Sequence, residues 1–154
     1  MPGRRTQDAG RSLRLPKVLH DEMIAHCQRE YPKEACGLLA AAIVGGPVVQ
    51  VYPMHNVEDS PIGYSMDPKE QLQVEKQMRS RGQRLAAIYH SHTASDAYPS
   101  SVDMSLAISP DISYVLVSLK DREHPVLKSY RIDRTTVTEE PVTLEGAPAG
   151  TRQT

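Results

Sequence analysis

The chain has 154 residues, of which 18 are basic and 19 are acidic, so its formal net charge is -1 at pH 7. This length suits one domain with a substantial core, and the balanced charge gives no reason to expect a nucleic-acid partner. Phe and Trp are absent and seven Tyr are the only aromatic residues, so the core must be largely aliphatic and stacking on bases is disfavoured. No apolar run reaches the roughly 18 residues of a membrane-spanning helix, and the N-terminus lacks the apolar segment of a secretory signal.

The cysteine content indicates the cellular compartment, and the composition of the chain ends indicates the limits of the domain. The two cysteines, Cys27 and Cys36, are too few for a disulfide framework, and free thiols favour a reducing compartment, so we expect a cytoplasmic protein. Residues 1–12 are polar and predict a disordered tail, and residues 145–154 predict a second, flexible tail. Residues 13–144 show no repeat or linker and are expected to form a single domain.

A short strand and an amphipathic helix are predicted first. The strand covers Leu13–Leu15, and the helix begins at Pro16 and ends before Pro32. His20 and His26 are predicted on its polar side. The apolar face consists of Leu19, Met23, Cys27 and Tyr31, with Val18 and Ile24 beside it.

Two strands joined by a turn follow the helix. Cys36–Val44 is a continuous apolar run, which predicts a central strand buried on both faces. Gly45–Pro47 predicts a turn, and Val48–Tyr52 predicts a returning strand. Residues 53–65 are expected to form a loop, in which His55 is an ordinary polar residue.

The second half of the chain predicts a surface helix and further strands. Asp67 can cap the helix, with Pro68 at its first position and Glu70 three residues after the cap, and Gly82 ends it. Strands are predicted at 85–89, 112–119, 126–132 and 135–144, the last an edge strand because Pro141 interrupts it. Three helices and about six strands in mixed order predict an α/β (α+β) domain, with helices packed on a mixed or mostly antiparallel sheet.

The sequence His90-Ser91-His92 follows the apolar strand directly and carries the strongest chemical signal. Residues two apart on a strand point to the same face, so the two imidazoles can converge on one point. Asp103 follows after a loop and can add a carboxylate from the far side. Two His and one Asp leave one position of a tetrahedral Zn²⁺ open, which is typical of catalytic rather than structural zinc sites, although the same ligands accept other divalent ions.

Each part of this pattern also has a purely structural interpretation. A histidine at a strand end can be a polar tip, although burying two imidazoles without partners is costly. Ser100-Ser101-Val102-Asp103 fits a capping box at a helix start. Capping and metal binding are compatible, because a helical turn can hold the Asp103 backbone while its carboxylate faces the metal.

A hydrolytic metal site needs a group that moves protons, and Glu34 is the candidate. It lies at the mouth of the predicted central strand, just before Cys36, although a carboxylate there can also be exposed and inactive. Catalysis by the Cys36 thiol with a nearby histidine is an alternative, but a cysteine within a strand is usually a small core residue. His124 is expected to be part of a turn.

Taken together, these residues resemble the JAMM (MPN-plus) metalloprotease signature. Glu34, His90-x-His92, seven residues, Ser100, two residues and Asp103 fill every position of that signature. The likeness runs over roughly residues 13–140 and is greatest to the bacterial short-form branch, which includes the actinobacterial Mec enzymes. The segments that carry it further are Glu-Ala-Cys-Gly-Leu-Leu from residue 34, Tyr-Ser-Met-Asp-Pro at 64–68, and His-Ser-His-Thr-Ala-Ser-Asp-Ala-Tyr-Pro-Ser from residue 90.

The resemblance implies a fold, a cofactor and an activity. The fold would be a curved mixed sheet flanked by helices, related to that of cytidine deaminases. His90, His92 and Asp103 would hold one Zn²⁺, Glu34 would be the general acid/base, and Ser100 would donate a hydrogen bond to the tetrahedral intermediate. The family cleaves amide bonds after the C-terminal Gly-Gly of ubiquitin-like proteins. In Mec-like members that protein is a sulfur carrier loaded with cysteine, and hydrolysis releases cysteine for cysteine biosynthesis.

Other functions stay open at this point. The chain can be an isopeptidase or processing protease that removes a ubiquitin-like modifier from other proteins, or a non-catalytic MPN scaffold. A nucleobase deaminase is disfavoured because the P-C-x-x-C ligand motif is absent. The sequence does not identify the carrier, and it leaves the oligomeric state open, with a homodimer among the alternatives.

Overall fold

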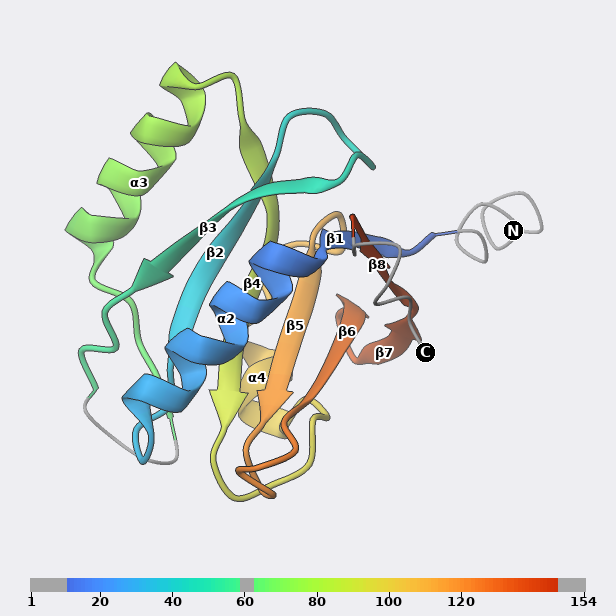
Figure 1. The fold of residues 1–154 in the computed structure, drawn as a ribbon. Helices are drawn as coiled ribbons and strands as arrows, with labels where there is room; N and C mark the ends of the chain where they lie inside the picture. Colours follow the sequence, from blue (N-terminus) through green and yellow to red (C-terminus); the bar gives the residue numbers. More distant parts are fainter. Residues whose placement is uncertain (1–10, 59–62, 147–154) are drawn as a thin grey trace.

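The computed structural model describes residues 11–58 and 63–146. Within them, a six-stranded sheet has the order β3-β2-β4-β5-β6-β7, and β1 pairs with β8 in a separate two-stranded sheet (Figure 1). The predicted tails at 1–12 and 145–154 lie mostly outside the described residues. The elements are β1 Leu13–Pro16, α2 Lys17–Glu30, β2 Cys36–Ala41, β3 Val48–Met54, α3 Pro68–Ser80, β4 Arg84–His92, α4 Ser101–Ser105, β5 Ser113–Ser118, β6 Val126–Asp133, β7 Thr136–Glu140 and β8 Val142–Glu145.

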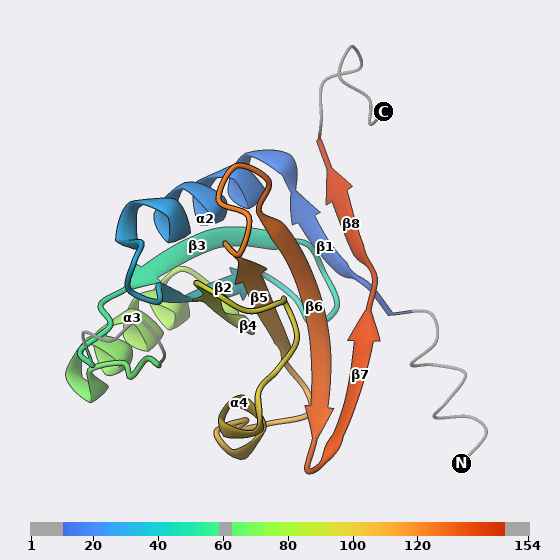
Figure 2. The ribbon, with the colours of Figure 1, turned by 90° about the horizontal axis from the view of Figure 1, so that it is seen from below.

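The main sheet is mixed, as predicted. Strands β4 and β5 are parallel neighbours, and the other neighbouring pairs of the six-stranded sheet are antiparallel. Helix α2 covers one face, while α3 and α4 lie on the other (Figure 2). Alternate residues of β2 separate accordingly, because Leu39 packs with Met23 of α2 and Leu38 packs with Met78 of α3. The central strand β2 is buried along its whole length, which confirms its predicted place.

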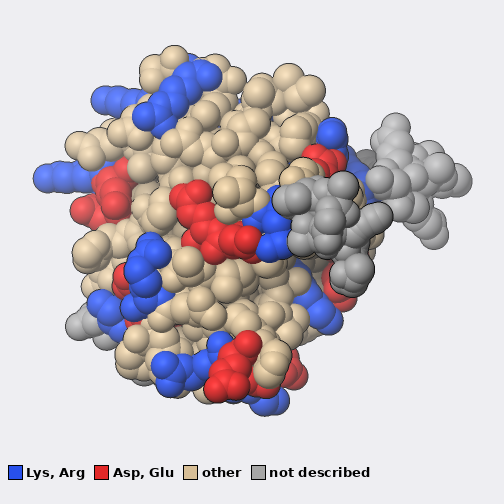
Figure 3. All heavy atoms as spheres, viewed as in Figure 1, with Lys and Arg blue, Asp and Glu red and all other residues tan. Residues whose placement is uncertain are grey.

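Acidic and basic side chains are interspersed over the face of the molecule seen in Figure 3. This distribution agrees with the small net charge of the chain. Across residues 11–58 and 63–146, no helix has both the length and the apolar character required to cross a membrane.

The prediction for His26 was wrong. His26 is buried in α2, and its Nδ1 lies 2.7 Å from the hydroxyl of Tyr89 on β4. The predicted neighbours Met23 and Cys27 are buried as expected, but Val18 is 71% exposed. The buried stripe of α2 is therefore rotated from the predicted one, and it includes a histidine because a tyrosine hydroxyl satisfies the ring nitrogen.

Two predicted strand boundaries were also wrong. Strand β2 ends at Ala41, and Ile43 and Val44 are exposed in the turn that follows. Strand β3 continues through Pro53 to Met54, which were expected in the loop. Pro53 is tolerated because β3 is an edge strand of the main sheet.

The last predicted strand is two strands. Pro141 separates β7, which is the edge strand of the main sheet, from β8, which pairs in parallel with β1. A proline has no N–H for the sheet ladder, so the pairing breaks there, and its carbonyl instead accepts the N–H of Leu13 at 2.9 Å. Leu15 of β1 is fully buried by this arrangement.

Candidate metal centre

The two histidines are the last part of β4, one of the inner strands of the main sheet. His90 is paired with Cys36 of β2 on one side and with Leu116 of β5 on the other. His90 and His92 are both buried, and their ring centroids are 5.1 Å apart. The sheet therefore holds both imidazoles on the same side of a rigid strand, as the spacing of two predicted.

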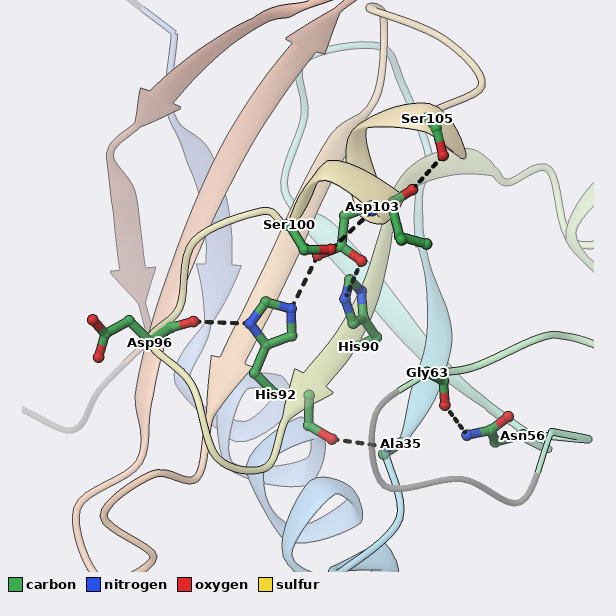
Figure 4. A network of polar contacts seen from close by, with 11 residues as sticks. Ala35, Asn56, Gly63, His90, His92, Asp96, Ser100, Asp103 and Ser105 are labelled. Atoms are coloured by element: carbon green, nitrogen blue, oxygen red, sulfur yellow. Dashed lines mark hydrogen bonds and ion pairs between the residues drawn. The ribbon is translucent and has the colours of Figure 1, made fainter.

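Asp103 reaches the histidines from the first turn of α4 (Figure 4). Its Oδ1 lies 3.1 Å from Nε2 of His90, and its Oδ2 lies 3.0 Å from Nε2 of His92. The capping box is also present. Ser100 Oγ accepts the N–H of Asp103 at 3.0 Å, and the N–H of Ser100 donates to Asp103 Oδ2 at 2.9 Å. Asp103 thus caps the helix and faces the histidines at once.

These three side chains fit a metal cation. Among the described residues, their candidate ligand atoms all lie within 4.8 Å of one another. The carbonyl of Asp96 can only accept, so His92 Nδ1 donates to it at 2.8 Å and the lone pair of a neutral ring is left on Nε2, opposite a carboxylate oxygen. The contact of His90 Nε2 with Asp103 lacks hydrogen-bond geometry, and within the described chain this buried nitrogen has no hydrogen-bond partner. A cation bound between these groups would satisfy all three.

The electrostatics of the cluster favour a charged carboxylate. Burial opposes ionisation of Asp103, but the ring nitrogens of His90 and His92 beside it hold the pKa of this carboxyl well below its usual range. Burial also opposes protonation of His92, yet the contact with Asp103 raises the pKa of this imidazole. Burial lowers the pKa of His90, which favours the neutral ring that a metal ligand requires.

Glu34 lies in the short segment that leads into β2 and is 7% exposed. Burial raises the pKa of its carboxyl to about 7; the charge of His92 partly opposes this shift, and the charges of Asp103 and Glu58 add to it. The next residue, Ala35, is hydrogen-bonded to Ser91, which lies between the two histidines, so the backbone at Glu34 is close to the histidine strand. A carboxyl group with this pKa can both take and release a proton near neutral pH.

Two further residues border the cluster and were not assigned a role from the sequence. The ring of Tyr64 is stacked on His90, with centroids 4.5 Å apart and planes at 29°. The side chain of Asn56, which is 6% exposed, donates to the carbonyl of Glu34 at 2.8 Å. Tyr64 belongs to a segment that carried the family resemblance, whereas Asn56 looked like an ordinary loop residue and had no periodic signal.

The other candidate residues do not join the cluster. Cys27 and Cys36 are fully buried free thiols, and burial raises the pKa of each to about 12, so neither is a ready nucleophile. His55 is exposed. His124 is exposed in a turn, where its ring contacts Asp121.

Comparison with known proteins places this arrangement in a family. Residues 16–133 match the model of the prokaryotic homologues of the JAB domain. The chain is 46% identical over 126 residues to the CysO-cysteine peptidase of Mycobacterium tuberculosis, covering 82% of this chain and 86% of that protein. It is 31% identical over 111 residues to the desampylase of Haloferax volcanii, covering 69% and 80%. It is 40% identical over 99 residues to a probable TtuB-protein conjugate cleaving protease of Thermus thermophilus, covering 64% and 65%.

Solved structures support the same fold. The solution structure of protein DSY2949 from Desulfitobacterium hafniense matches with a TM-score of 0.79 and 39% identity, covering 92% of this chain and 99% of that one. The JAB1/MPN domain protein AF2198 from Archaeoglobus fulgidus matches with a TM-score of 0.56 and 17% identity, covering 87% and 100%, which bears on the fold alone. With the fold, the extent of the match and the named relatives in agreement, the chain belongs to the prokaryotic JAB-domain family of the JAB/MPN proteins.

Proposed function

We propose that this protein is a zinc metallopeptidase that hydrolyses the amide bond after the C-terminal Gly-Gly of a ubiquitin-like sulfur-carrier protein and releases cysteine from a carrier–cysteine adduct. The main support is the cluster of His90, His92 and Asp103 with a buried carboxyl, Glu34, beside it. The 46% identity to a CysO-cysteine peptidase supports the cysteine adduct as the substrate.

His90, His92 and Asp103 are the residues that would hold one zinc ion. When bound there, zinc supplies a Lewis acid that polarises a carbonyl and lowers the pKa of water. The hydrogen bond from His92 Nδ1 to the carbonyl of Asp96 orients that ring for its role as a ligand. The Ser100 backbone does the same for Asp103.

Glu34 and Ser100 carry out the proton transfer and the charge stabilisation. The Glu34 carboxylate takes a proton from the attacking water and passes it to the departing nitrogen, which its pKa of about 7 permits. Ser100 Oγ accepts the N–H of Asp103, so its own hydrogen is available to the oxyanion of the tetrahedral intermediate. Donors of this kind contribute about 3–4 kcal/mol in other enzymes.

The test is intact-mass spectrometry on one reaction. The substrate is the host's sulfur-carrier protein ending in Gly-Gly, with cysteine joined to it through an amide bond. Zinc-loaded wild-type enzyme should remove one cysteine mass, and Glu34→Gln, with verified zinc, should remove none. No loss from verified zinc-loaded wild-type enzyme would exclude cysteine release as the activity.

The ligand set has its own test. Asp103→Ala should lose tightly bound zinc, measured by inductively coupled plasma mass spectrometry after dialysis, while Glu34→Gln should retain it. A tightly bound, equimolar zinc in Asp103→Ala would contradict the assignment.

A second candidate is cleavage of a ubiquitin-like modifier from protein lysines. It is supported by the likeness to a probable TtuB-protein conjugate cleaving protease and to a desampylase. The same zinc site and base would serve, because only the leaving amine differs. Lysine-linked adducts of the same carrier, compared with the cysteine adduct by kcat/KM, would distinguish the two substrates.

A further inference from the structure

Asn56 is the only asparagine of the chain, and its buried side chain makes four hydrogen bonds to the backbone. Its Nδ2 donates to the carbonyls of Glu34 at 2.8 Å and Gly63 at 3.0 Å. Its Oδ1 accepts the N–H groups of Glu58 at 2.9 Å and Ser65 at 3.1 Å. Because a carbonyl can only accept and an N–H can only donate, these partners fix which side-chain atom is Oδ1 and which is Nδ2. Every side-chain donor and acceptor direction of Asn56 is therefore used.

Three of these bonds join Asn56 to two segments that are separate in the sequence, and the fourth, from Glu58, is local. One is the chain at Glu34, just before β2, and the other is the segment around 63–65, which carries Tyr64. Figure 4 shows Asn56 and Gly63 beside the start of β2 at Ala35. Tyr64 lies between two of these anchored residues, and its ring is stacked on His90. The amide thus fixes the approach of Tyr64 to the metal cluster.

The backbone next to Glu34 is also held from the other side. Ser91, between the two histidines, accepts the N–H of Ala35 on its Oγ at 2.8 Å and donates its own N–H to the Ala35 carbonyl at 3.0 Å. Ser91 therefore ties residue 35 to the histidine strand, and Asn56 ties the Glu34 carbonyl to the loop. Without Asn56, the peptide of Glu34 keeps one of these two restraints.

We propose that Asn56 is a positioning residue that holds Glu34 and Tyr64 in place against the metal cluster, so that its loss lowers kcat without loss of zinc. This inference rests on the proposed function, since Glu34 acts there as the proton carrier. A displacement of about 1 Å at a reacting group can lower turnover about 100-fold. Truncation of the Asn56 side chain leaves two N–H groups and two carbonyls without this partner, which loosens both segments.

The test uses full-length, zinc-loaded protein and two variants with a matched control. Asn56→Ala removes all four bonds, and Asn56→Asp keeps the shape and the acceptor but replaces the donor that faces Glu34. The control is Gln83→Ala, which removes another part-buried amide with bonds to Tyr52 and Gln50. Gln83 precedes the start of β4, whereas the histidines lie at its end.

Turnover and zinc content form the first readout. Both Asn56 variants should lower kcat about 10- to 100-fold on the carrier–cysteine adduct, with KM changed less than about threefold and zinc still equimolar. Gln83→Ala should keep kcat within about twofold of wild type. An Asn56→Asp kcat within twofold of wild type would overturn the proposal even if Asn56→Ala fails to fold.

Amide exchange measured by NMR is the second readout and does not depend on activity. In Asn56→Ala the amides of Glu58 and Ser65 should exchange faster, while the amide of Ala35, held by Ser91, should stay protected. Selective ¹⁵N-asparagine labelling of wild type should give one slowly exchanging side-chain amide, that of Asn56. Unchanged protection of Glu58 and Ser65 in the variant would show that Asn56 does not hold this segment.

The two proposals fail in different ways. If the zinc-loaded wild-type enzyme does not release cysteine, the proposed function is wrong. The positioning role of Asn56 is then tested by amide exchange and by the nuclear Overhauser contact between Tyr64 and His90. That contact should weaken in Asn56→Ala, and its persistence at full strength would overturn the positioning role. If wild type turns over and the Asn56 variants match it, the positioning role alone falls.

Discussion

Glu34 is a carboxyl group placed where ionisation is unfavourable. Burial raises its pKa from 4.5 to about 7, and the neighbouring charges of Asp103 and Glu58 act in the same direction. The folded protein therefore binds this proton more tightly than the unfolded chain does. Stability is lost as the pH rises from the unfolded pKa to the folded one, and the loss is complete above the folded value. The proposed proton carrier is therefore held in the fold at a cost in stability above pH 7.

Replacing this carboxyl with an amide should remove that loss. In chelator-treated protein, Glu34→Gln should be more stable than wild type by about 1–3 kcal/mol at pH 8 and nearly equal to it at pH 4.5. Urea unfolding of both proteins across this range measures the difference. A difference that stays constant with pH would show that Glu34 titrates normally in the fold.

Gly37 is needed because a tyrosine ring lies over it. It pairs with Tyr89 across β2 and β4, and a Cβ at residue 37 would come within 2.2 Å of Tyr89 Cε2 and 2.5 Å of its hydroxyl. The ring cannot move away freely, because its hydroxyl is hydrogen-bonded to His26 in the core. Close contact between backbone and ring therefore requires glycine here.

We expect Gly37→Ala to lower the free energy of unfolding by about 1–3 kcal/mol through overpacking. Tyr89→Phe should not rescue it, since the ring carbons still clash when the hydroxyl is gone. Thermal unfolding of the single and double variants is the measurement. A melting temperature equal to that of wild type would mean that the ring has room to shift.

Helices α3 and α4 both begin with a side chain that caps the first turn, whereas α2 has no such cap. Asp67 begins α3 by accepting the N–H of Lys69 at 3.0 Å, and Pro68 follows at the first position. The predicted partner Glu70 does not close a capping box but accepts the N–H of His55 at 3.0 Å. It therefore ties α3 to the end of β3. Helix α4, with five residues, depends on its capping box.

The cap of α3 can be tested without disturbing the metal cluster. Asp67→Ala should cost about 1 kcal/mol of stability, and Asp67→Ser should restore most of it. Because α3 covers the sheet by its own packing of Met78, turnover at 25 °C should stay within about twofold of wild type. Equal stability of Asp67→Ala and wild type in urea unfolding would show that the cap is not needed.

For the molecule as a whole, zinc binding at the proposed site would be linked to folding, because the three proposed ligands meet only in the folded chain. Zinc in 1,000-fold excess over its dissociation constant should stabilise the protein by about 4 kcal/mol. The melting temperature should fall on chelation and rise again with added zinc, measured by calorimetry. Asp103→Ala should show little of this dependence. If zinc raised the melting temperature of Asp103→Ala as much as that of wild type, the metal would have to bind at another site.

Local patterns predicted much of this molecule and missed the contacts between distant residues. The apolar runs located β2, β4 and β5, and the spacing of His90, His92 and Asp103 predicted the cluster. The pair of His26 and Tyr89, 63 residues apart, leaves no periodic trace in either segment. The pairing of β8 with β1 and the bond from Asn56 to Glu34 also join residues that are distant in the sequence. Local patterns therefore do not distinguish buried polar residues such as His26 and Asn56 from surface ones.

The position of β1 sets how the molecule can be oriented on a surface. Ser12 and Leu13 line the same hollow as Arg84, which is the first residue of the strand that ends in His92. Nine residues of strand separate these ends by roughly 26 Å. An anchor joined to the chain before Leu13 would therefore lie near the opposite end of β4 from His92. Immobilisation through this end would keep the support away from the proposed metal site and leave room there for the proposed carrier protein.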